Sequence, residues 1–221
     1  MMSTANPGPL TLVNNDLVAI TTLVGSAMNL ATQSLLDADL SLAEKVIQAD
    51  ANIDTLCSAV EDRCLELLED KRSTGSELRS IIGALRIAAS LERMGDLAEH
   101  VAKQARMRYP NAAVPQDLRE TFAIMGGVAE AIVSKSGAVI ATKDVSLASE
   151  IAIHDAEMDF RHRELFTIVL SPSWAHGVEA AIDVTLLSRY YERYADHAVS
   201  VTRRVINVVT GEPYVAVDIT S

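Results

Sequence analysis

Apolar residues recur along this chain three or four positions apart, which is the spacing of an amphipathic helix. From Ser41 to about residue 70 the apolar stripe is Val46, Ile47, Ile53, Leu56, Val60, Leu67 and Leu68. The segment that begins near Gln116 has a similar stripe of Phe122, Met125, Val128, Ile132 and Val139. No stretch shows the strict alternation of a half-buried strand, so we predict an all-α fold.

Capping and breaking residues divide the first half of this pattern into three helices. We expect them over residues 15–36, from Ser41 to about residue 70, and from Thr74 to about residue 109. Ser41-Leu42-Ala43-Glu44 and Thr74-Gly75-Ser76-Glu77 each have the hydroxyl and carboxylate of a capping box. Pro110 ends the third helix, and residues 111–115 are a linker.

The second half follows the same plan. The fourth helix begins near Gln116, and Asp144 or Ser146 caps a fifth helix that runs to about residue 170. Ser171-Pro172 reads as the N-cap and first residue of the sixth helix, which Gly211 ends. Three helices, a linker and three more predict two antiparallel three-helix bundles, with residues 15–109 as the first domain and 116–210 as the second.

A twelve-residue signature occurs twice, 100 residues apart. Glu92–Lys103 reads ERMGDLAEHVAK and Glu192–Arg203 reads ERYADHAVSVTR, with five identical positions and a cation at the end of both. Each copy lies toward the end of a long helical pattern. We therefore expect a duplicated unit, because self-similarity at a fixed offset is typical of repeated structure.

Composition and charge narrow the possible partners. The chain has 30 acidic and 19 basic residues and a formal net charge of −11, which argues against nucleic acid and favours cations or a basic protein surface. No signal-peptide pattern and no uninterrupted run of 18 apolar residues is present, so a cytoplasmic protein is expected. Cys57 and Cys64, seven residues apart on one helix, are expected to be buried thiols.

Four pairs of carboxylates stand four residues apart, so the members of each pair project from the same helix face. The pairs are Glu92 with Asp96, Glu192 with Asp196, Asp50 with Asp54, and Asp155 with Asp159. Like charges at this spacing repel each other, and either a multivalent cation or neighbouring Arg93, Arg193 or Lys103 can compensate. Spacing alone leaves a metal site and a solvated acidic stripe both open, and the duplication favours the metal site.

Catalytic patterns are missing from the sequence. It contains no Glu-x-x-His ligand motif of a di-iron bundle, no Gly-x-Ser-x-Gly, no phosphate-binding glycine loop and no zinc spacing. His154, His162 and His176 read as surface or packing residues, and Trp174 as a core or cap residue at a helix start. We therefore predict that the chain is not an enzyme.

The two signatures carry a family resemblance. Glu92-Arg93-Met94-Gly95-Asp96 and the segment Tyr191–Ala198 resemble the paired motifs of the PhoU family, and residues 183–189 and 201–205 resemble its actinobacterial, PhoY-like branch. The resemblance extends from about Leu17 to Gly211. It implies six helices in two bundles and a cytoplasmic regulator, often a homodimer, that reaches the membrane only through its partners.

The resemblance also implies partners and ligands. The partners would be the phosphate ABC transporter and its sensor histidine kinase. Some relatives bind iron or another divalent or trivalent metal cluster through E/D-x-x-x-D motifs, and the corresponding ligands here are Glu92, Asp96, Glu192 and Asp196, faced by Asp50, Asp54, Asp155 and Asp159. Leu97 stands where the second copy has His197, so the two metal sites are expected to be unequal. Residues 68–78 also lack the usual Gln and Pro.

Three hypotheses follow. The first is a non-enzymatic adaptor that represses phosphate uptake and the phosphate-starvation response. The second is a metal-binding helical module whose metal occupancy controls partner binding outside phosphate signalling. The third, an enzyme of unknown chemistry, has no catalytic group to support it.

Overall fold

The computed structural model describes residues 8–69 and 74–212, and these form six long helices. The helices are α1 (Pro9–Asp37), α2 (Leu40–Glu69), α3 (Gly75–Arg108), α4 (Arg119–Thr142), α5 (Ala148–Val169) and α6 (Gly177–Thr210). Short 3-10 turns, η1 (Gln116–Leu118) and η2 (Val145–Leu147), precede α4 and α5. The described residues contain no strand, and the predicted fold of two antiparallel three-helix bundles is confirmed.

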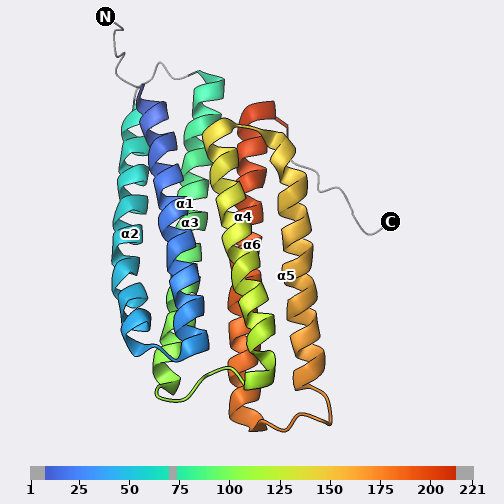
Figure 1. Ribbon diagram of the computed structural model, residues 1–221. Helices are drawn as coiled ribbons and strands as arrows, with labels where there is room; N and C mark the ends of the chain where they lie inside the picture. Colours follow the sequence, from blue (N-terminus) through green and yellow to red (C-terminus); the bar gives the residue numbers. More distant parts are fainter. Residues whose placement is uncertain (1–7, 70–73, 213–221) are drawn as a thin grey trace, which may run out of the picture.

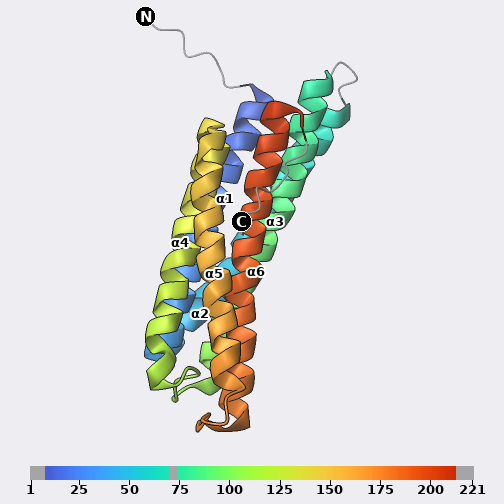
Figure 2. The ribbon, with the colours of Figure 1, turned by 90° about the vertical axis from the view of Figure 1, so that its right-hand side faces the viewer.

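The six helices lie roughly along one long axis (Figure 1). We call α1–α3 the first half and α4–α6 the second half. The halves meet along two helix pairs, α1 with α4 and α3 with α6, while α2 packs outside α1 and α3 and α5 packs outside α4 and α6 (Figures 1 and 2). The face formed by α1 and α4 is therefore opposite the face formed by α3 and α6.

The core between the helices is largely aliphatic, with a few aromatic side chains from the second half. Phe122, Tyr191 and Tyr194 are fully buried. The Tyr191 hydroxyl lies 2.7 Å from Thr32 Oγ1, and Tyr194 donates a hydrogen bond to the carbonyl of Val24 at 3.3 Å. Both tyrosines of α6 thus find a polar partner on α1, as buried hydroxyls require.

Two of the predicted helix starts in the first half differ from the structure. α1 begins at Pro9 rather than near residue 15, because proline is well suited to the first turn of a helix. α2 begins at Leu40, and the Asp39 carboxylate accepts a hydrogen bond from the Leu42 N–H at 2.9 Å. The predicted capping box at Ser41 is therefore wrong, since Asp39 supplies the cap two residues earlier.

The capping box at Thr74 is confirmed. Glu77 N–H donates to the Thr74 hydroxyl at 3.4 Å, and Thr74 N–H donates to the Glu77 carboxylate at 2.6 Å. Asp144 also caps as predicted, accepting a hydrogen bond from the Ser146 N–H at the start of η2.

The predicted start of the sixth helix at Ser171-Pro172 is wrong. Residues 171–174 form a turn in which the Trp174 N–H donates to the Ser171 carbonyl at 3.0 Å. The Trp174 indole N–H donates to the Gly177 carbonyl at 2.8 Å, which ties this turn to the first residue of α6. Gly211 ends α6 as predicted, with a φ of 76° that suits glycine.

Candidate metal centre

Three carboxylates converge between α2 and α3 in the first half. Asp50 and Asp54 come from α2 and Asp96 from α3, and one oxygen of each lies within 4.8 Å of the others. The i, i+4 spacing on α2 places both aspartates on the side that faces α3. Helix packing thus brings one predicted acidic pair against a member of the other.

Asp50 is the buried member of this group. Asp50 is only 9% exposed, and its Oδ1 has no hydrogen-bond partner. Burial, followed by the negative charges of Asp54, Glu99 and Asp96, raises the pKa of Asp50 to about 6. A buried carboxylate oxygen without a donor is costly unless a cation or a proton satisfies it.

Gly95 on α3 allows this approach. A Cβ at Gly95 would lie 2.9 Å from Oδ1 of Asp50 and 3.2 Å from Cγ2 of Ile53. The missing side chain therefore leaves the space in which the Asp50 carboxylate sits. Hard cations prefer such oxygen ligands, and an orphaned buried oxygen in a cluster of three carboxylates fits a cation of this class.

Basic side chains neutralise part of the cluster. Arg93 donates to Asp96 at 2.8 Å, and Lys103 pairs with Glu99 at 2.5 Å. These are the compensating residues that the sequence suggested as an alternative to metal. Neither reaches Oδ1 of Asp50, which remains without a donor.

The remaining acidic residue of the first half, Glu92, lies near the same cluster. Burial raises its pKa, and the charge of Asp54 raises it further, whereas Arg93 lowers it. Glu92 is therefore within electrostatic reach of α2, but the three oxygens that converge do not include its own.

The second half gathers the equivalent residues less tightly. Burial, followed by the negative charges of Asp159 and Asp196, raises the pKa of Asp155 on α5 to about 6, and the positive charge of Arg203 opposes this shift. Burial also raises the pKa of Glu192, which forms an ion pair with Arg189. Within residues 8–69 and 74–212, no second trio of acidic, histidine or cysteine ligands converges as closely as Asp50, Asp54 and Asp96.

Two residues beside the acidic cluster were not predicted from the sequence as part of the site. Glu99 faces Asp50 from α3 and follows Asp96 by three residues and Glu92 by seven, so its helical spacing was a usable signal. Gly95 carried no such signal, because its role depends on how closely α2 approaches.

The histidines have other contacts. His162 Nδ1 lies 3.0 Å from the Ser188 hydroxyl, and its ring packs edge-on against Phe166. His176 pairs with Asp117 and packs against Trp174. Burial lowers the pKa of His197, and the positive charge of Arg193 lowers it further. These contacts agree with a packing role for His162 and His176.

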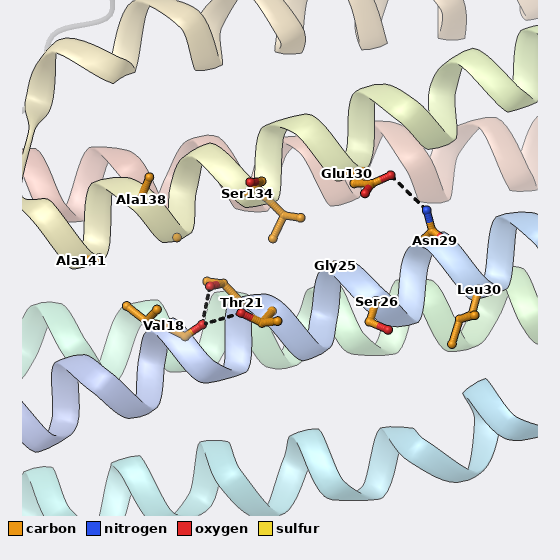
Figure 3. A pocket seen from close by; sticks show the side chains of 13 residues that line it. Val18, Thr21, Gly25, Ser26, Asn29, Leu30, Glu130, Ser134, Ala138 and Ala141 are labelled. Carbon is orange, nitrogen blue, oxygen red and sulfur yellow. Dashed lines mark hydrogen bonds between the residues drawn. The ribbon is translucent and has the colours of Figure 1, made fainter.

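The opposite face carries a groove of about 560 Å³ between α1 and α4 (Figure 3). Small residues line much of it, among them Gly25, Ser26, Ser134 and Ala138. Asn29 donates to Glu130 across the groove at 3.0 Å. No cluster of nucleophile, base and acid lines it, so the acidic cluster remains the better candidate for a site.

α1 and the segment Gln116–Thr142 are also long and apolar enough to cross a membrane, by length and composition alone. Their most apolar windows are 33% and 50% buried in the bundle. Core helices of soluble proteins pass the same test, and both of these helices pack against others in the bundle.

Comparison with known proteins agrees with this architecture. The chain matches the PhoU domain family over residues 17–105 and 122–205. It is 45% identical over 210 residues to the phosphate-specific transport system accessory protein PhoU homolog 2 of Mycobacterium tuberculosis, covering 95% of this chain and 99% of that protein. It is 42% identical over 189 residues to homolog 1 of the same organism, covering 86% of each.

Solved structures show the same fold. The crystal structure of PhoU from Pseudomonas aeruginosa superposes with a TM-score of 0.83 at 27% identity, covering 92% of this chain and 98% of that one. The phosphate transport system regulatory protein PhoU from Streptococcus pneumoniae gives 0.84 at 22% identity, covering 94% and 98%. With matches in both halves and close mycobacterial relatives, this chain belongs to the PhoU family, in its actinobacterial branch.

Proposed function

We propose that this protein is a cytoplasmic negative regulator of phosphate uptake and of the phosphate-starvation response. It acts as an adaptor between the phosphate ABC transporter and its sensor histidine kinase, and it catalyses no reaction itself. The observation that carries the proposal is the 45% identity to a phosphate transport accessory protein along 95% of the chain.

The geometry supports an adaptor rather than an enzyme. The described residues hold one tight cluster of carboxylates, and its members lack the nucleophile and base of a catalytic group. An accessory protein needs surfaces that its partners can bind, and the face formed by α3 and α6 is a charged surface. Its exposed Arg93 and Arg193 stand among the carboxylates of both halves.

Deleting the gene in its native host tests the regulatory role. Transcripts of phosphate-responsive genes should rise in phosphate-rich medium, and a plasmid copy of the chain should return them to the wild-type level. Transcript levels that deletion leaves unchanged in that medium would contradict the proposal. We also propose that the regulator is a homodimer. Light scattering on the purified protein measures its molecular mass and so tests this oligomeric state.

A second proposal concerns metal. Asp50, Asp54 and Asp96, with Glu92 nearby, would hold iron or another hard cation, and their counterparts in the second half are Asp155, Asp159, Glu192 and Asp196. The cation would neutralise the carboxylates and thereby set the shape and charge of the face that partners meet. The buried, unpartnered Oδ1 of Asp50 is the observation that favours it.

Metal content tests this second proposal. Protein purified without chelators should contain metal by elemental mass spectrometry. The quadruple variant Glu92→Ala, Asp96→Ala, Glu192→Ala and Asp196→Ala should lose it while keeping its helical circular dichroism. If the variant that has lost its metal still represses phosphate-responsive genes fully, metal does not control the regulator, and the adaptor proposal stands alone.

A further inference from the structure

The two halves differ at one small residue beside their carboxylates. The signature that begins at Glu92 has Gly95 at its fourth position, and the signature that begins at Glu192 has Ala195 there. Both residues are buried. The difference is a single methyl group, and what it does depends on the neighbouring helix.

In the first half that methyl group has no room. A Cβ at Gly95 would stand 2.9 Å from Asp50 Oδ1 and 3.2 Å from Ile53 Cγ2, both on α2. Contacts below 3.0 Å force a neighbour to move, and Ile53 is branched at Cβ and packed in the core. The absence of a side chain at Gly95 therefore permits Asp50 to be buried in a position where one of its oxygens lies within 4.8 Å of an oxygen of Asp54 and of Asp96.

In the second half the equivalent carboxylates stay more open. Asp155, the equivalent of the buried Asp50, is partly exposed. Asp196, the equivalent of the partly exposed Asp96, is exposed. Met158 stands in place of Ile53, and its flexible side chain tolerates a methyl group beside it more readily. Val199 stands in place of Glu99, so the second half also has one carboxylate fewer.

We propose that the first half is the primary divalent-cation site, that its ligands are Asp50, Asp54 and Asp96, and that Gly95 is the positioning residue that builds it. The second half binds the same cation more weakly. This inference rests on the metal proposal above and adds which half binds, and why.

Titration with Mn²⁺ tests the inference, since the paramagnetic resonance signal of free Mn²⁺ falls as the ion binds. Gly95→Ala should weaken the tighter site by about 10- to 100-fold, the range seen when the support of a metal ligand is lost. The matched control is Gly127→Ala, an exposed glycine of α4 with open space around its Cα, which should bind Mn²⁺ as the wild type does.

A second pair of variants covers the case in which Gly95→Ala fails to fold. Asp54 is exposed, so Asp54→Asn should fold and lose the tighter site, whereas Asp159→Asn at the equivalent position should keep it. Thermal unfolding of each variant, with and without Mn²⁺, gives an independent readout, because a cation bound only to the native state raises the melting temperature.

The outcomes separate the two proposals. Wild-type protein that takes up no Mn²⁺ would overturn this inference, without touching the adaptor role, and the elemental metal content decides the metal proposal separately. Wild-type binding that Gly95→Ala leaves unchanged, or that Asp159→Asn weakens as much as Asp54→Asn does, would overturn this inference alone.

Discussion

At the scale of single residues, Asp50 shows how packing creates chemistry that its own sequence position does not reveal. An aspartate on an amphipathic helix is ordinarily solvated; helical spacing paired Asp50 with Asp54, and the family resemblance placed both opposite the signature carboxylates. The structure buries it to 9% exposure against Gly95 and leaves Oδ1 without a donor. The carboxylate pairs were predictable from helical spacing, whereas the burial of Asp50 was not, because it depends on a contact between two helices.

The buried carboxyl of Asp50 makes stability depend on pH. Its pKa is about 6 in the native state against 3.8 ordinarily, so between these values the native state binds more protons than the unfolded chain. The stabilisation from this group is complete below about pH 3.8 and is lost as the pH rises through 6. In metal-free protein, Asp50→Asn should therefore be more stable than the wild type at pH 8, by about 1–3 kcal/mol.

Urea unfolding in the presence of a chelator, at pH 4 and at pH 8, measures this effect. The advantage of Asp50→Asn should vanish at pH 4, where Asp50 is largely protonated in the native wild-type protein. A difference between variant and wild type that is the same at both pH values would show that the Asp50 charge does not set it.

At the scale of elements, local signals were reliable where both partners were close in sequence. The Thr74 and Glu77 capping box, the Asp144 cap and the Gly211 stop each involve residues within a few positions, and all three are confirmed. Ser41 and Ser171-Pro172 failed because a second local solution competed. Asp39 caps α2 two residues before Ser41, and the turn that contains Trp174 places the start of α6 after it, at Gly177.

The close approach of two helices could not be predicted from residues that are near each other in the sequence. Gly126 on α4 lies against Thr32 of α1, where an added Cβ would stand 2.5 Å from Thr32 Cγ2. Thr32 is itself held by hydrogen bonds to the Met28 carbonyl and the Tyr191 hydroxyl. Gly126→Ala should therefore cost about 1–3 kcal/mol of unfolding free energy through overpacking.

The neighbouring glycine is the matched control. Gly127 is exposed with open space around it, so Gly127→Ala should gain about 0.5–1 kcal/mol from helix propensity. Chemical denaturation of both variants compares them directly. Shifts of the same sign and size would mean that α1 and α4 do not meet at Gly126 as the structure has them.

At the scale of the whole molecule, the two halves are joined by α3 against α6 on one face and α1 against α4 on the other (Figure 2). Asp183 of α6 is buried and accepts hydrogen bonds from Gln104 at 2.5 Å and from Arg108 Nε at 2.6 Å, both on α3. These partners are more than 70 residues apart in sequence, so spacing could not pair them. The duplication suggested the two bundles but not the contacts that unite them.

Removing the Asp183 carboxylate should weaken the junction between the halves. Asp183→Ala leaves Gln104 and Arg108 without their acceptor and should cost about 2–4 kcal/mol of unfolding free energy. Glu179→Ala removes an exposed partner of the same Arg108 and should remain near the wild type. Thermal or urea unfolding measures both variants, and equal stability of the two would argue against a junction that depends on Asp183.

We expect this PhoU-family chain to restrain phosphate uptake when phosphate is plentiful. The rate of radiolabelled phosphate uptake by host cells grown in phosphate-rich medium measures that restraint directly. Cells without the chain should take up phosphate faster than the wild type, and a plasmid copy should restore the wild-type rate. Equal uptake rates with and without the chain, in cells whose transporter is expressed, would contradict a restraining role for this protein.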